Sequence, residues 1–98
     1  MSEPLSKKIE KLEERSTQTV QKIRKVSDKV SKELREEFNE RIDDGRKLIK
    51  HIDDHLEKTE DKTKDSYRIL RRQVKRTVDE LIEAWSETGE EPVIVTYE

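Results

Sequence analysis

Two histidines four residues apart have the clearest potential for chemistry in this chain. His51 and His55 would share one face of a helix, where two imidazole nitrogens can bind one transition-metal ion. The segment is not a zinc-protease motif, because Ile52 stands where that motif needs its general-base glutamate. Beyond Asp54 or a second chain, no further ligand is evident. We therefore expect surface histidines and no metal site, with a pH-sensitive packing role for His55 as the next interpretation.

A second candidate site is a basic stripe in the C-terminal half of the chain. Its members recur at three- and four-residue steps, so they would line one side of a helix. They are Lys64, Arg68, Arg71, Arg72, Lys75 and Arg76. Such a stripe could contact phosphates of nucleic acid or an anionic membrane surface, but the net charge is −2 and no aromatic residues alternate with the basic ones. The acidic block 33–61 of another subunit is the partner we favour, with nucleic acid or an anionic surface as the alternative.

Enzymatic chemistry is not expected. The chain has no cysteine, no glycine-rich phosphate loop and no evident pair of nucleophile and base. We expect a protein that is not an enzyme and needs no cofactor.

The element that must position these residues is a long amphipathic helix pattern. From Leu5 to Trp85 the apolar residues recur mostly at three- and four-residue steps, which predicts helix rather than strand. Steps of eleven residues from Leu12 meet an apolar residue each time except at Gly45, an interval close to three helical turns. The fold class is therefore predicted as all-α and similar to a coiled coil.

Helix-breaking residues are rare and suggest where the chain turns. Pro4 is typical of a helix start, and Gly89 of a helix end; Gly45 lies close to their midpoint. We predict an antiparallel helical hairpin over residues 1–89, with arms at about 4–43 and 46–88 and a turn near Gly45. Leu5 would then face Trp85.

Two other arrangements remain open. The helix could run straight through Gly45, at a cost of about 1 kcal/mol, in an antiparallel dimer of two chains. Alternatively, breaks near Ser27 and Asp28 and within residues 57–66 would give a three-helix bundle. We rank the bundle last, because neither break contains glycine or proline.

Self-association is expected because a lone hairpin makes a thin core. Charged residues form 47% of the chain and hydrophobic residues 29%, so the apolar stripe would need a second copy, as a dimer or four-helix bundle. The predicted oligomer interface consists of Leu5, Ile9, Leu12, Val20, Ile23, Leu34, Phe38, Ile52, Leu56, Tyr67, Leu70, Val74, Val78, Leu81 and Trp85.

The last nine residues, 90–98, differ in character. After Pro92 the sequence is rich in β-branched and aromatic residues, which favour strands and could pair with a partner's sheet edge. The predicted recognition residues of this extended tail are Val93, Ile94, Val95 and Tyr97.

The sequence thus predicts a structural or adaptor protein that self-associates through its stripe and binds a protein partner through its tail. Binding of nucleic acid or an anionic surface through the basic stripe is the second hypothesis, and an amphipathic helix adsorbed on lipid is the third. We expect a cytoplasmic location, because the sequence has neither a signal-peptide core nor a run of about 20 apolar residues.

Overall fold

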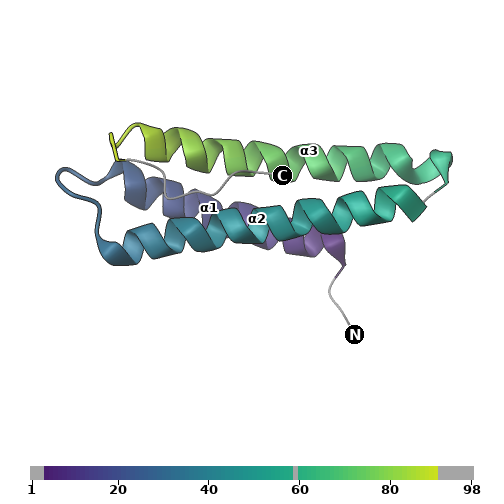
Figure 1. The fold of residues 1–98 in the computed structure, drawn as a ribbon, viewed down its shortest axis with the longest axis horizontal. Coiled ribbons are helices and arrows are strands. Elements are labelled where there is room, and N and C mark those ends of the chain that lie inside the picture. The colour runs from purple at the N-terminus through teal and green to yellow at the C-terminus, as the bar shows by residue number, and fades with distance from the viewer. Residues whose placement is uncertain (1–3, 59, 91–98) are drawn as a thin grey trace.

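Three helices pack side by side in an up-down-up bundle (Figure 1). The computed structural model describes residues 4–58 and 60–90, the side chains of 61–63 excepted. Helix α1 spans Leu5–Arg24, α2 spans Lys32–Lys58 and α3 spans Asp61–Ser86. The bundle is an elongated rod of 50 × 27 × 19 Å. The predicted all-α class is confirmed for the described residues.

The predicted turn near Gly45 is wrong. Gly45 is the central residue of α2, a continuous helix of 27 residues. The predicted pairing of Leu5 with Trp85 is also wrong, because α1 and α3 run parallel: Arg24 at the end of α1 lies 3.6 Å from Glu87, just after α3. Glycine in a helix interior costs only about 1 kcal/mol relative to alanine. The apolar surface that α2 buries against α1 and α3 outweighs this cost.

The three-helix arrangement that we ranked last is the one observed. The first break, residues 25–31, ends at Ser31, whose Oγ accepts a hydrogen bond of 3.1 Å from the Leu34 N–H. This is the bond that an N-cap serine makes, so α2 begins without help from glycine or proline. Val30 of this loop is buried and packs in the core. The second break precedes α3, where Glu60 has an extended backbone with φ −69° and ψ 152°.

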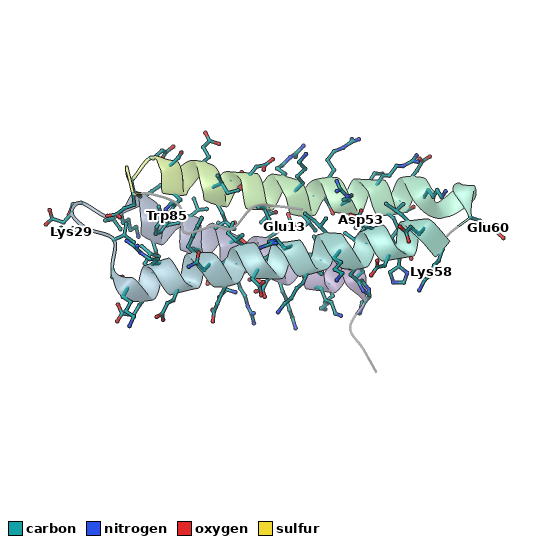
Figure 2. All side chains as sticks on the ribbon, viewed as in Figure 1. Glu13, Lys29, Asp53, Lys58, Glu60 and Trp85 are labelled. Carbon is teal, nitrogen blue, oxygen red and sulfur yellow. The ribbon has the colours of Figure 1, made fainter. Side chains whose placement is uncertain are left out.

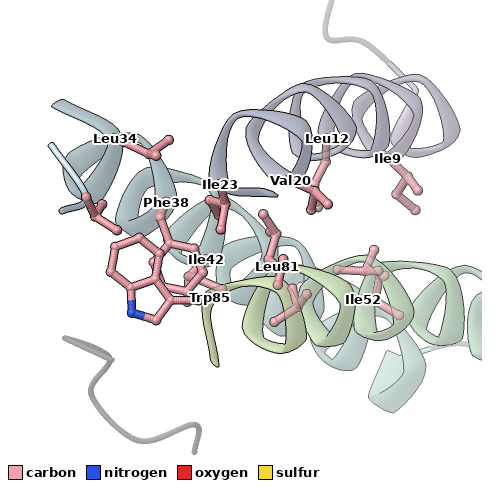
Figure 3. Packing of buried hydrophobic residues seen from close by; sticks show 14 residues of the cluster. Ile9, Leu12, Val20, Ile23, Leu34, Phe38, Ile42, Ile52, Leu81 and Trp85 are labelled. Atoms are coloured by element: carbon pink, nitrogen blue, oxygen red, sulfur yellow. The ribbon is translucent and has the colours of Figure 1, made fainter. Parts of the chain in front are cut away.

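The core is filled by side chains from all three helices (Figure 3). Its two largest fully buried side chains are Trp85 of α3 and Phe38 of α2, which stack with ring centroids 4.4 Å apart. Ile23 and Leu81 are also almost completely buried. The rings and branched side chains bury apolar area that stabilises the fold by roughly 25 cal/mol per Å².

Most of the predicted oligomer interface forms the core of a single chain. Eleven of its residues are buried within the bundle: Ile9, Leu12, Val20, Ile23, Leu34, Phe38, Ile52, Val74, Val78, Leu81 and Trp85. The remaining four are only partly buried: Leu5, Leu56, Tyr67 and Leu70. A third helix thus supplies the burial for which the hairpin interpretation required a second copy.

Gly45 sets how closely the helices approach. A Cβ placed on Gly45 would overlap Val78 Cγ2 of α3, and it would lie 3.8 Å from Leu12 Cδ2 of α1. The missing side chain therefore lets α3 and α1 pack against the middle of α2. Glycine at this position serves packing and not a turn.

Two further predictions concern the chain ends and the membrane. The recognition residues predicted in the tail, Val93, Ile94, Val95 and Tyr97, lie outside the described residues. Among the described helices, none is long and apolar enough to cross a bilayer.

Candidate functional site

The predicted basic stripe divides into two groups in the structure. Arg71 contacts α2, where its Nε donates a 2.8 Å hydrogen bond to Asp53 Oδ1. Figure 2 labels Asp53 on α2. Arg68 pairs within its own helix with Asp65, at 3.3 Å. Lys64 is half-buried near the start of α3. These three residues therefore do not form one free cationic surface.

The second group consists of cations without carboxylate partners. Arg72, Lys75 and Arg76 are exposed, and none makes an ion pair with any residue that the structure describes. Arg72 and Arg76 are four residues apart on one helix face, so like charges repel each other along the helix. Their arrangement costs α3 stability within the isolated chain.

Three carboxylates follow directly along the same helix. Asp79, Glu80 and Glu83 are exposed and, in the described part of the chain, also lack ion-pair partners. The last turn of α3 contains no basic residue, although a helix C-terminus favours cations. The charge order of α3 is thus opposite to the order that would stabilise the helix by itself.

Cations and carboxylates together form one surface, which we call the α3 outer face. Its members recur at three- and four-residue steps on the side of α3 opposite the buried Val74, Val78 and Leu81. They are Ile69, Arg72, Arg76, Asp79, Glu80 and Glu83. Ile69 is 56% exposed and is the one large hydrophobic residue in the described chain that is exposed. Around the bundle axis, this face points away from both α1 and α2.

A groove of about 830 Å³ lies beside this face, between α2 and α3. Its apolar lining comes from Ile49, Val78 and Ile82, while its charged lining carries both signs, including Lys75 and Asp79. Mixed charge of this kind does not select for a polyanion, since the carboxylates repel phosphates.

The two histidines lie on the surface, near the C-terminal end of α2. His51 Nε2 and His55 Nε2 are 3.2 Å apart, and both residues are exposed. The His55 ring stacks on Tyr67 of α3, with ring centroids 5.5 Å apart and planes 5° from parallel. No cluster of three or more metal-ligating side chains occurs among the residues that the structure describes.

Beyond the first residue of α1, this end of the bundle has only two helices. Arg24 of α1 and Glu87 after α3 lie together at the opposite end, and α1 is six residues shorter than α3, so α1 begins about 9 Å short of the start of α3. Figure 1 shows α2 and α3 extending past the beginning of α1. We call this end of the bundle, including the start of α1, the open end; it holds the four partly buried residues of the predicted oligomer interface, Leu5, Leu56, Tyr67 and Leu70.

A partly buried polar contact joins α1 to α2. Thr19 Oγ1 lies 2.9 Å from Glu37 Oε2 and 3.0 Å from the Arg15 carbonyl oxygen, and Lys22 Nζ donates to Glu37 Oε1 at 2.9 Å. Burial raises the pKa of Glu37, but the hydrogen bonds from Lys22 and Thr19 outweigh it and hold the pKa below 4.5. The contact fixes the register of these helices and does not form a binding site.

The chain was also compared with known proteins. No protein family, curated protein or solved structure matches the chain.

Sequence reasoning identified the cations of the α3 outer face and missed its carboxylates. Their signal is nevertheless present in the sequence, because 69, 72, 76, 80 and 83 continue one helix face across the border between two charge blocks. Residues 62–76 carry seven basic and one acidic residue, and 77–98 carry seven acidic and no basic residues.

Proposed function

We propose that this protein is a non-enzymatic helical assembly module whose α3 outer face binds a second copy of the same chain. The observation that carries the proposal is the two-block charge of this face. Its cations and its carboxylates lack partners within the described chain and lie in adjacent turns of one helix. A helix with such blocks is complementary to itself when two copies pack antiparallel.

The proposed pairing has twofold symmetry, so each contact occurs twice. With the axis between Arg76 and Asp79, Arg76 of one copy lies opposite Asp79 of the other, and Arg72 lies opposite Glu83. Ile69 is covered at the edge of the contact. Like charges that repel each other within each helix would then be neutralised across the interface.

The interface is expected to be weak and sensitive to salt. Exposed ion pairs contribute only about 0–1 kcal/mol each, and a single exposed isoleucine adds little apolar area. The screening length falls from about 10 Å at 0.1 M salt to about 3 Å at 1 M. A reversible dimer at low salt that dissociates at high salt is therefore the expected behaviour.

Charge exchange between two variants tests this pairing. We would measure molecular mass by sedimentation equilibrium for Arg72→Glu/Arg76→Glu and for Asp79→Lys/Glu83→Lys, separately and mixed. Each variant alone brings like charges together and should be monomeric, whereas the mixture should form a heterodimer. The matched control is Lys25→Glu/Lys29→Glu, which changes net charge as much as the first variant but lies in the α1–α2 loop.

Two results would overturn the proposal. A wild-type chain that remains monomeric at low salt and high concentration has no self-association to explain. A mixture no heavier than its separate components would show that the α3 outer face is not the contact. If the wild type instead binds DNA or anionic vesicles and Arg72→Glu/Arg76→Glu alone abolishes this binding, the basic residues serve polyanion recognition.

A further inference from the structure

We propose that His51 and His55 form a bidentate binding site for a divalent transition-metal ion of the Cu²⁺, Ni²⁺ and Zn²⁺ class. The site is independent of the α3 outer face, since it lies on α2 near the open end of the bundle. Among the side chains that the structure describes, no third metal ligand joins the pair.

The distance between the two ring nitrogens carries this inference. Nitrogen ligands lie about 2.0–2.1 Å from zinc, so two of them that subtend an angle of about 90–110° at the metal are about 2.9–3.4 Å apart. The observed separation of His51 Nε2 and His55 Nε2 is 3.2 Å. The rings are already turned toward each other, with centroids 4.6 Å apart and planes 80° from parallel.

The helix and its neighbour fix the two rings in place. Residues four apart on a helix have Cβ atoms about 5–6 Å apart, which lets two imidazoles reach one point from a rigid backbone. The His55 ring is held on its outer side by the face of Tyr67. A preorganised pair loses less conformational entropy on binding than two mobile side chains do.

The surroundings leave the metal accessible to solvent. Both histidines are exposed, and Asp54 on the same stretch of α2 is exposed as well. Imidazole ligands favour metals late in the first transition series, and affinity at nitrogen sites is highest for Cu²⁺. Hard cations such as Mg²⁺ prefer oxygen ligands and should not compete.

The test compares the wild-type pair with a variant whose two histidines are placed too far apart to bind the same metal ion. Untagged protein is titrated with NiCl₂ by calorimetry, and the Cu²⁺ complex is examined by electron paramagnetic resonance for coupling to nitrogen. His51→Gln and His55→Gln each remove one ligand. The variant His55→Gln/Glu57→His keeps two histidines but places them six residues apart, on different sides of α2.

Wild type should bind one Ni²⁺ per chain at least tenfold more tightly than any of the three variants, and its Cu²⁺ spectrum should show two nitrogen ligands. All variants should retain the helical circular dichroism of the wild type, since the substituted side chains are exposed. Equal affinity in the wild type and in His55→Gln/Glu57→His would overturn the proposal, because binding would then not depend on the pair. A spectrum with one nitrogen ligand would overturn it independently.

Discussion

Replacement of Gly45 by alanine tests whether α2 and α3 touch as closely as the structure shows. Two effects oppose each other. Alanine is favoured over glycine in a helix interior by about 1 kcal/mol, which would stabilise α2. Its Cβ would overlap Val78 Cγ2, and Val78 is 1% exposed and has a stiff β-branched side chain. Overpacking of a filled core costs about 1–3 kcal/mol.

The steric term should dominate, so Gly45→Ala is expected to destabilise the protein by about 1 kcal/mol. Val78→Ala alone removes two buried methyl groups and should cost about 2 kcal/mol. In the double variant, the new methyl group occupies the space that Val78 leaves, and the gain in helix propensity is kept. We therefore expect the double variant to be more stable than the sum of the single effects by about 2 kcal/mol.

Urea unfolding followed by circular dichroism at 222 nm measures these free energies of unfolding. Gly89→Ala is the matched control, because Gly89 has a φ of +78° and no atom of the described residues lies within 4 Å of its missing Cβ. Its substitution strains the backbone, and Val78→Ala should not rescue it. If Gly45→Ala stabilises the protein by about 1 kcal/mol and adds to Val78→Ala without coupling, the close approach at Gly45 is refuted.

Three further predictions concern polar contacts and local stability. Ser16 is 2% exposed and its Oγ has no hydrogen-bond partner among the described residues, so Ser16→Ala should raise the free energy of unfolding by about 1 kcal/mol; a loss of stability in urea unfolding would contradict this. Because the folded pKa of Glu37 is lowered, its contribution is present above its unfolded pKa and is lost as the pH falls through the folded value, so stability should fall less between pH 5 and pH 3 in Glu37→Gln than in wild type. Amide hydrogen exchange should be faster at the open end around Leu56 than around Phe38, where Trp85 stacks; uniform protection along α2 would contradict this difference.

The helical period and the core residues could be predicted from the sequence, but the position of the chain reversals could not. The apolar pattern is nearly symmetric about Gly45, and a straight helix with uniform apolar spacing has the same symmetry as a hairpin. Phe38 and Ile52, for example, are equally far from Gly45 and lie on the same core face of α2. Symmetry of spacing therefore does not distinguish two facing arms from one central helix.

Neither break between the helices contains glycine or proline, because a helix can end and another begin without them. Ser31 starts α2 by accepting the Leu34 N–H, and its value as an N-cap was readable from the sequence. The sequence does not show whether the chain continues as one helix or reverses direction and buries the apolar face of a third helix. Tertiary burial decides that competition, and Val30 in the α1–α2 loop contributes to it.

The candidate sites show the same division between local and spatial information. The spacing of His51 and His55 predicts a shared face, but only the ring orientations bring their Nε2 atoms to 3.2 Å. Spacing likewise grouped Arg71 with Arg72, although Arg71 lies against Asp53 of α2 while Arg72 faces solvent. Which side of α3 faces α2 depends on how the bundle packs. The predicted basic stripe is therefore divided between Arg71, which contacts α2, and Arg72, which lies on the exposed surface.

The distribution of charge along α3 indicates that this helix is not arranged for its own stability. Arg72 and Arg76 repel each other at a cost of about 0.2–0.5 kcal/mol. The last turn has Glu83 and no cation, and each charge near a helix end contributes about 0.3–1 kcal/mol in an exposed helix. The buried Phe38–Trp85 contact at the same end of the bundle can bear that cost. Charge on a face that the core does not need is free to serve recognition, and a face whose two halves are complementary is suited to a second copy of itself.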